Sequence, residues 1–259
     1  MKSVLMAVVG MVLWGLASAA TADMQSWNYK SSYSTTDNSL GAGKFASGYL
    51  YELPGYFGTY NKYANDGGYN GINRWDDSGT AGQNTDTHGN AGINTNATAT
   101  EMNTWGGGMY FEAGQTTLMP GTSGVWAAIR WTAPATGQYV ISALFTDQCL
   151  DAGAGKTTGV RVREGAPDGA PYWTSTLSGF VGRAVNNYDD ATGTNPSATY
   201  SGTLSLTAGQ AIDFIVEAGN TKYRMTGVDI TITTVPVPEP ASLALLALGG
   251  LAFLRRRRS

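Results

Sequence analysis

The chain has 259 residues, a formal net charge of −3 and only 14% charged residues. Its single cysteine, Cys149, excludes an intrachain disulfide, so the fold must be held together by a hydrophobic core. The 35 glycines and the many small polar residues disfavour long helices and favour short strands joined by turns.

The charge is unevenly distributed along the chain. Lys2 and Arg255–Arg258 supply five positive charges and Glu239 one negative charge, so the chain between these ends has a net charge near −7. An acidic surface repels phosphate backbones, which argues against nucleic acid as a partner.

The first 22 residues have the organisation of a secretory signal peptide. Lys2 gives a positive start, residues 4–16 form an apolar run, and Ala17-Ser18-Ala19 is a small-residue cleavage site. Ala20-Thr21-Ala22 offers a second site, so we expect cleavage after Ala19 or Ala22. The alternative, a permanent membrane anchor, is disfavoured because the apolar run is short and small residues follow it.

Residues 23–234 remain as the exported domain, and their first half has few regular patterns. Trp27-Asn28-Tyr29 predicts a first strand. Apolar residues nearly vanish between Asp76 and Thr100, which predicts a long surface loop. Leu118-Met119-Pro120-Gly121 predicts a turn before the next strand.

Regular alternation begins at Val125. Residues 125–131 predict a strand with one strongly apolar face. Residues 139–145 are apolar on both faces, because Val140 and Leu144 alternate with the other apolar residues, and this predicts a central position in a sandwich. Val160 and Val162 are expected to point inward, with Arg161 and Arg163 on a basic outer face.

The last strands follow the same pattern. Residues 172–177 predict one strand, residues 212–216 predict another with Asp213 outside, and residues 228–232 close the domain. The fold is therefore expected to be all-β, an antiparallel and jelly-roll-like β-sandwich between a signal peptide and a short C-terminal membrane helix. The expected core residues are Ile129, Trp131, Tyr139, Ile141, Phe145, Val160, Val162, Leu204, Leu206, Ile212, Phe214, Val216, Val228, Ile230 and Ile232.

The C-terminal segment, residues 235–259, has three parts. Pro238-Glu239-Pro240 cannot form helix or strand, because prolines fix φ and lack N–H donors. Residues 241–254 carry no charge and are mostly Leu and Ala, which predicts a short helix in a membrane. Arg255, Arg256, Arg257 and Arg258 then form a positively charged stop. The alternative is a buried core helix, which four terminal arginines disfavour.

This order of Pro238-Glu239-Pro240, an apolar run at 241–254 and arginines at 255–258 closely resembles the PEP-CTERM sorting tail. The resemblance covers about the last tenth of the chain and gives an address rather than an activity. It implies that an exosortase-type membrane protease recognises and cuts the tail during export to a Gram-negative cell envelope. It also implies a link to exopolysaccharide or biofilm formation.

A second resemblance lies in the domain. Residues 125–134, 137–139, 206–214 and 226–229 look like the β-sandwich carried by many PEP-CTERM proteins and are similar to carbohydrate-binding-module-like jelly rolls. These matches consist of strand and turn patterns, so the resemblance supports a fold and carries over no ligand residue.

The residues offer little for catalysis. His88 is the only histidine, and the zinc and nucleophile motifs that would give it partners are absent. Paired carboxylates would be needed for a glycosidase, and the candidates are Glu52, Asp76, Asp77, Glu101, Glu112, Asp147 and Asp151. Nothing in the sequence shows that any two of them meet, so we expect a protein that is not an enzyme and needs no cofactor.

Two kinds of binding site are suggested by composition. Asp147 with Asp151, and Asp189 with Asp190, lie in oxygen-rich segments that suit calcium; the alternative is turns capped by their own side chains. A second set consists of aromatic residues that would stack on sugars or, alternatively, pack in the core. This set is Tyr56, Tyr60, Tyr63, Tyr69 and Trp75.

Three classes of function follow. The first is a non-catalytic exported protein of the cell surface or extracellular matrix, held in the membrane by its C-terminal segment before processing. The second is a glycan-binding protein in the same location, and the third is a secreted polysaccharide hydrolase. Cys149 either is buried as a small apolar side chain or pairs with a second molecule.

Overall fold

The computed structural model describes residues 24–34, 37–53, 56–57, 61–62, 65–69, 72–76, 89–97, 100–104, 107–121, 124–148, 157–166, 169–178, 196–218 and 225–236. The chain divides into two compact units, residues 26–233 and the two flanking segments 1–25 and 234–259. In the flanking unit the Thr234 N–H donates to the Gln25 carbonyl oxygen at 2.9 Å. The predicted signal peptide and the 241–254 helix lie outside the described residues. Within the described ranges, no helix has the length and apolar content needed to cross a bilayer.

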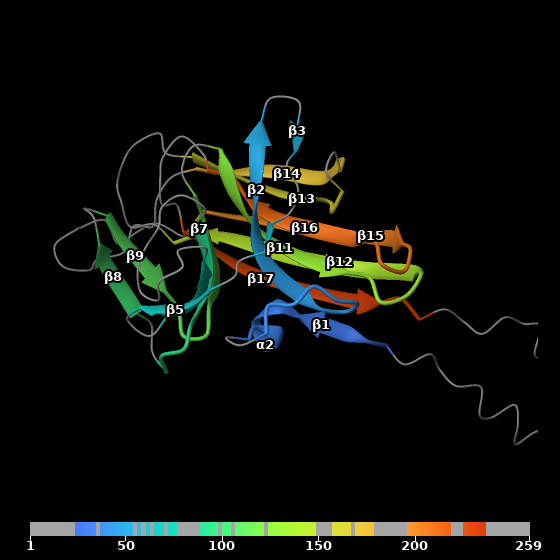
Figure 1. The fold of residues 1–259 in the computed structure, drawn as a ribbon, viewed down its shortest axis with the longest axis horizontal. Helices are drawn as coiled ribbons and strands as arrows, with labels where there is room; N and C mark the ends of the chain where they lie inside the picture. Colours follow the sequence, from blue (N-terminus) through green and yellow to red (C-terminus); the bar gives the residue numbers. More distant parts are fainter. Residues whose placement is uncertain are drawn as a thin grey trace, which may run out of the picture. The chain divides into compact units, whose positions relative to one another are not determined.

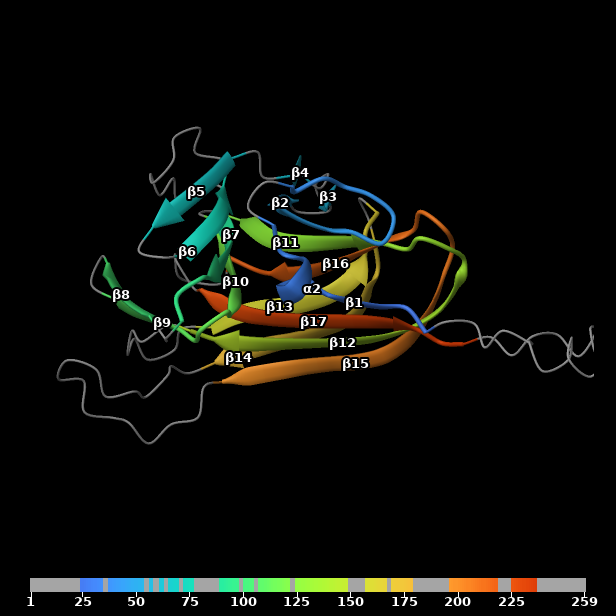
Figure 2. The same ribbon diagram turned by 90° about the horizontal axis from the view of Figure 1, so that it is seen from below.

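Sheet A is the larger of the two main sheets, and its strands are antiparallel (Figures 1 and 2). In spatial order its main path is β15 (Ser197–Leu206), β12 (Gly137–Asp147), β17 (Thr226–Thr234), β10 (Thr116–Pro120), β7 (Gly89–Asn94), β6 (Ile72–Asp76) and β5 (Asn65–Tyr69). The short strand β1 (Ser26–Asn28) also pairs with β17 and leads into helix α2 (Tyr29–Ser32).

Sheet B lies across the core from sheet A and is also antiparallel. Its order is β14 (Pro171–Ser178), β13 (Thr157–Glu164), β16 (Ala211–Val216), β11 (Val125–Thr132), β2 (Phe45–Leu53) and β3 (Tyr56–Phe57), with β4 (Asn61–Lys62) also on β2. Strands β8 (Thr100–Thr104) and β9 (Gly107–Phe111) form a separate pair. The predicted all-β antiparallel sandwich is confirmed.

The core between the sheets is rich in aromatic residues. Trp131 of β11 packs edge-on against Trp27 at 5.3 Å and against Tyr139 at 5.2 Å between ring centroids. Such pairs add to the area that each ring buries, and this offsets the scarcity of leucine in the chain. Every predicted core residue is buried except Leu204, which is partly buried and packs against the core.

The predicted surface loop between Asp76 and Thr100 is wrong for its second half. Strand β7 lies within it, paired with both β6 and β10, and its residues are mostly buried. Asn94 is fully buried. Its amide tolerates burial because it donates to the carbonyls of Phe111 and Glu112, at 3.2 and 3.1 Å. Polar side chains can thus fill a sheet when each finds a hydrogen-bond partner, and a low apolar content does not exclude a strand.

Two further predictions in this region need correction. The predicted turn at 118–121 is instead strand β10, in which Pro120 stands at the last position. The strand predicted at 27–29 ends one residue early, because Asn28 caps α2: its Oδ1 accepts from the Ser31 N–H at 3.0 Å.

Strand β12 has the predicted central position, between β15 and β17, but only one buried face. Val140 and Leu144 are 43% and 40% exposed. They lie on the outer face of sheet A, the face turned away from the core. The second apolar face of residues 139–145 therefore contributes to the surface.

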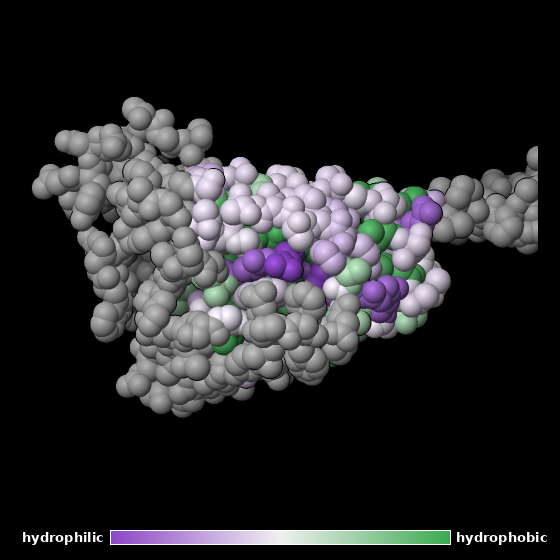
Figure 3. Space-filling view, turned by 90° about the horizontal axis from the view of Figure 1, so that it is seen from above, coloured by the Kyte–Doolittle hydropathy of each residue, from purple (hydrophilic) through white to green (hydrophobic). Residues whose placement is uncertain are grey.

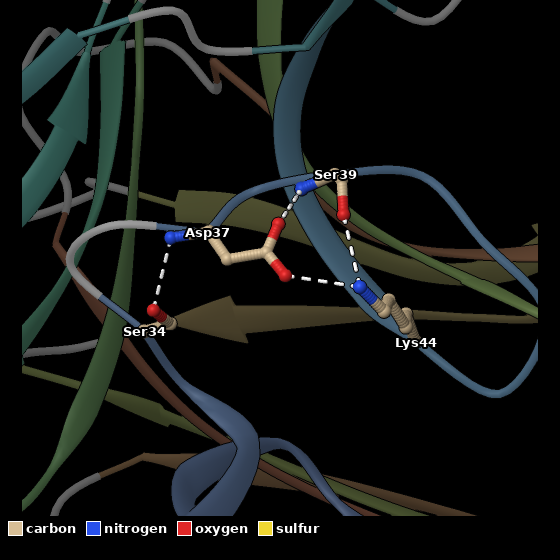
Figure 4. A network of polar contacts seen from close by, with 4 residues as sticks. All are labelled: Ser34, Asp37, Ser39 and Lys44. Carbon is tan, nitrogen blue, oxygen red and sulfur yellow. Dashed lines mark hydrogen bonds and ion pairs between the residues drawn. The ribbon is translucent and has the colours of Figure 1, made fainter.

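The segment between α2 and β2 is fixed by side-chain bonds. Asp37 accepts from the Ser39 N–H and from Lys44 Nζ, both at 2.9 Å, and its own N–H donates to Ser34 Oγ (Figure 4). These bonds, with Ser39 first and Lys44 second, hold the pKa of Asp37 well below its usual range. The neighbouring Asn38 is buried and bonds both the N–H and the carbonyl of Ser47 in β2.

Candidate functional site

The predicted sorting and cleavage residues cannot be placed in this structure. Pro238, Glu239, Pro240 and Arg255–Arg258 lie outside the described residues, as do Ala19 and Ala22. The sorting tail is therefore identified from its sequence alone. The surfaces that the structure describes belong to the domain between the two predicted targeting segments.

The predicted aromatic set is divided between the two sheets. Tyr56 lies in β3 of sheet B, whereas Tyr69 lies in β5 and Trp75 in β6 of sheet A. Tyr60 and Tyr63 lie outside the described residues. A single platform built from all five stays a prediction.

The predicted calcium ligands are placed only in part. Asp147 is the last residue of β12 and is buried. Asp151, Asp189 and Asp190 lie outside the described residues, together with His88 and Cys149. Among the side chains that the structure describes, no three His, Cys, Asp or Glu residues gather closely enough to hold a metal ion.

A buried charge cluster crosses the outer face of sheet B. Asp213 of β16 stands in register between Arg130 of β11 and Arg163 of β13. Arg130 donates through Nε to Oδ1 at 2.6 Å and through Nη2 to Oδ2 at 2.7 Å, and Arg163 Nη2 lies 3.5 Å from Oδ2. Sequence reasoning placed Asp213 and Arg163 on the exposed outside of their strands, yet both are buried.

The cause of this difference is pairing. A buried charge is tolerated when an opposite charge and hydrogen bonds replace its water, and period-2 alternation shows only that the two residues share a face. Burial lowers the pKa of the Arg163 guanidinium, although Asp213 raises it in part. Arg130, Asp213 and Arg163 therefore act together as a structural unit.

A second ion pair lies on the same outer face of sheet B, two residues along β13 from Arg163. Arg161 of β13 bonds the carboxylate of Glu217, and its guanidinium lies 4.6 Å from the ring centroid of Trp126. Gly159 leaves space for that carboxylate, since an added Cβ would overlap it. Figure 3, which looks onto the β14 and β13 side of the sandwich, shows strongly hydrophilic side chains gathered across the middle of that face. Charge here is paired and stacked, as expected of a structural surface.

A pocket lies on sheet A, across the core from the charge cluster of sheet B. A hollow of about 180 Å³ opens on the outer face of sheet A, where β12 and β17 meet α2 and the turn before β10. Its charged lining is Lys30, Glu112 and Asp229, and Leu144 gives an apolar wall. The rest of the lining is Ala113, Gln115, Thr116, Thr146, Gly227 and Val228.

The floor of this pocket depends on Gly227. A Cβ at this position would overlap the amide nitrogen of Gln115 and lie 2.9 Å from that of Gln148. Gln115 is oriented by its own turn, because its Oε1 accepts from the Glu112 N–H at 2.9 Å. Asp229 is held from the side by Asn28, whose Nδ2 donates to Oδ1 at 3.2 Å. The walls are thus arranged by hydrogen bonds.

The pocket lining combines one ammonium group, two carboxylates, one side-chain amide and two hydroxyls with the aliphatic residues Ala113, Leu144 and Val228. This mixture of donors and acceptors suits a polyhydroxylated ligand better than an apolar one. Sequence reasoning missed the pocket, although it used Val228, Ile230 and Ile232 as core. The available signal was a glycine inside a strand, which often marks a close approach.

The PEP-CTERM protein-sorting motif matches residues 236–258. The chain thus carries the sorting tail expected from its sequence, and this tail marks an exported protein and implies processing by exosortase. No curated protein matches the sequence.

Several solved structures are similar to parts of this chain. The adhesin domain of Lys-gingipain from Porphyromonas gingivalis is 15% identical, covers 47% of this chain and 74% of its own, and has a TM-score of 0.31. The xylan-binding domain CBM22-1 from Paenibacillus barcinonensis has 11% identity, coverage of 54% and 87%, and a TM-score of 0.29. A carbohydrate-binding module of a Cellvibrio mixtus lichenase, solved with cellotriose, is 16% identical. The match covers 54% of this chain and 88% of that module, with a TM-score of 0.26. The sandwich assignment rests on the strand pairing and burial in this chain.

Proposed function

We propose that this chain is a non-catalytic protein of the cell surface or extracellular matrix, delivered by its C-terminal tail and linked to exopolysaccharide or biofilm. The observation that carries the proposal is the PEP-CTERM motif at residues 236–258. The β-sandwich is the exported cargo, and its acidic, disulfide-free composition suits a scaffold held by its core.

The tail would act in three steps. Residues 241–254 enter the membrane, and four arginines stop transfer, since one arginine at the bilayer centre costs about 2.5–3.5 kcal/mol on insertion scales. Pro238-Glu239-Pro240 then stands extended outside the membrane, because prolines keep the backbone out of helix. An extended backbone is the form that a protease reads, and Glu239 gives it a charged handle.

Tail variants test the proposal by intact mass and cell fractionation. Replacing Arg255–Arg258 by serine should let the tail pass through, so that uncut protein appears in the medium. Replacing all four by lysine is the matched control, since it keeps the charge and should be processed normally. Changing Pro238-Glu239-Pro240 to alanines should leave an uncut, membrane-held form. Wild-type processing of both the serine and the alanine variants would refute a sorting role.

A second candidate function is glycan binding, and the pocket on sheet A favours it. Lys30, Glu112 and Asp229 place one donor group and two acceptor groups around the apolar wall of Leu144. A sugar offers both hydroxyls and an aliphatic face, so it uses all of these groups at once. The described lining of this pocket contains no member of the predicted aromatic set.

Calorimetric titration with oligosaccharides tests this second function. Glu112→Gln and Leu144→Ala should each weaken binding about tenfold, the cost of one lost contact of about 1.4 kcal/mol. Trp75→Ala is the comparison variant: loss of binding there, with no effect of the pocket variants, would favour the predicted aromatic platform. Turnover of the same sugars would instead support the hydrolase alternative.

A further inference from the structure

Strand β15 forms one edge of sheet A. It pairs with β12 over ten consecutive residues, from Ser197 opposite Thr146 to Leu206 opposite Gly137, without a shift of register. No described strand pairs with its other side. Figure 2 shows β15 as the outermost labelled strand of its layer, with β14 of sheet B beside it.

The hydrogen bonds to β12 show which backbone groups β15 leaves open. The Asp147 N–H donates to the Pro196 carbonyl at 2.9 Å, so residues 147 and 196 form a hydrogen-bonded position. In an antiparallel pair such positions alternate along the strand. The even-numbered residues of β15 therefore bond to β12, and the odd-numbered residues direct their N–H and C=O groups to the open edge. The odd-numbered residues are Ser197, Thr199, Ser201, Thr203 and Ser205.

All five odd-numbered side chains are exposed hydroxyls, and their order is a palindrome centred on Ser201. Natural sheet edges are usually protected by lysine, proline, bulges or a short length. Residues 197–206 contain no charge and no proline, and their pairing with β12 has no bulge. The neighbouring strand β14 is an edge of sheet B. It begins with Pro171 and has a register shift against β13. Of the two adjacent edges, β15 is the one left open to pairing.

We infer that β15 is a self-association edge, on which β15 of a second copy of this chain pairs antiparallel about a two-fold axis at Ser201. In this register Ser201 faces Ser201 of the second copy, Thr199 faces Thr203, and Ser197 faces Ser205. The pairing forms about ten backbone hydrogen bonds and joins two sheets into one. Like hydroxyl residues meet at each position, Ser with Ser and Thr with Thr, and such cross-strand hydroxyl pairs are favourable.

The occupant is a second copy because the palindrome makes the edge complementary to itself. A two-fold interface brings the same residues together, so a charge near the axis would face its own copy and repel. The lack of any charge in residues 197–206 removes this penalty. It also leaves the edge without the electrostatic features that would select a charged partner of another kind.

The first test compares Ser201→Pro with Ser201→Ala, using the full chain in detergent so that every variant has the same tail. Both changes remove the hydroxyl, but only proline removes the N–H at the open edge, and that N–H takes no part in pairing with β12. By sedimentation velocity, Ser201→Pro should weaken dimerisation at least about tenfold, whereas Ser201→Ala should stay within about threefold. Equal dimerisation of both variants, or a monomeric wild type, would overturn the inference.

A second pair of variants covers the case in which proline disturbs the fold. Ser201→Lys keeps the N–H and sets two positive charges against each other at the axis, so it should also weaken the dimer. Ser142→Lys is the matched control, since Ser142 lies opposite Ser201 on the same exposed face but one strand inward. Equal dimerisation of these two variants would refute the edge contact. In a Cys149→Ser background, Ser201→Cys should give a disulfide-linked dimer, and failure to cross-link would refute the proposed register.

Discussion

Arg130 and Asp213 face each other across β11 and β16 and are joined by two parallel hydrogen bonds of 2.6 and 2.7 Å. The carboxylate is fully buried and also serves Arg163, whose side chain is 2% exposed. Asp213→Ala leaves a buried positive charge without its main counter-charge, and breaking such a pair costs about 3–5 kcal/mol. Urea unfolding should show a loss of this size.

The exposed pair of Asp37 and Lys44 gives the matched control. Their side chains are 51% and 53% exposed, so water screens the attraction. Lys44→Ala should lower the free energy of unfolding by no more than about 1 kcal/mol. If Asp213→Ala and Lys44→Ala lower the free energy of unfolding equally, the buried charge cluster stabilises the fold no more than the exposed pair does.

Two glycines with the same backbone conformation separate steric overlap from conformational strain. Gly89 and Gly209 have φ of 76° and 83°. An added Cβ at Gly209 meets nothing within 4 Å, whereas at Gly89 it overlaps the Met119 carbonyl oxygen. Gly209→Ala should cost about 1–2 kcal/mol, the price of left-handed backbone, and Gly89→Ala clearly more. Similar midpoints of thermal unfolding for the two variants would show that β7 can move away from β10.

Alkaline pH should weaken the fold through Tyr29. Burial raises the pKa of its phenol above the ordinary value of 10.0, and the hydrogen bond with Ser47 lowers it only in part. Below pH 10 the phenol is neutral in both states and the stabilisation is complete. Above pH 10 the unfolded chain ionises first, so the free energy of unfolding falls with rising pH by up to about 1.4 kcal/mol per unit.

The check is the pH dependence of urea unfolding between pH 8 and about 11. Tyr29→Phe should reduce the alkaline slope but not remove it, because burial also raises the pKa of Tyr200 and of Tyr172. An unchanged slope in Tyr29→Phe would contradict the assignment of this effect to Tyr29.

The sequence predicts the second half of the sandwich well and the first half poorly. From Val125 onward the large core residues recur at every second position of the strands, so period and core both follow from the pattern. Strand β7 has no such pattern, because glycine and hydrogen-bonded asparagine fill its positions. Sequence composition cannot show that Asn94 finds its partners at Phe111 and Glu112, which depends on the tertiary fold.

The candidate site was beyond sequence reasoning for a related reason. Lys30, Glu112 and Asp229 are far apart in the chain and meet only because β1 and β10 pair with the same edge of β17, the edge opposite β12. Their local sequences give no sign of this. Arg163 and Asp213 show the same limit: alternation places both on the outer face, and only the pairing between β13 and β16 shows that they lie together.

Gly227→Ala should fill the pocket on sheet A without unfolding the protein. The added Cβ meets the ends of two flexible side chains, Gln115 and Gln148, rather than backbone, so the glutamines can rotate away. We therefore expect the free energy of unfolding to change by less than about 1.5 kcal/mol, while oligosaccharide affinity falls about tenfold. Gly209→Ala is the control, because it alters a distant turn and should leave affinity unchanged. Unaltered affinity in a folded Gly227→Ala protein would remove the pocket as the glycan site and leave the predicted aromatic set as the surface to test.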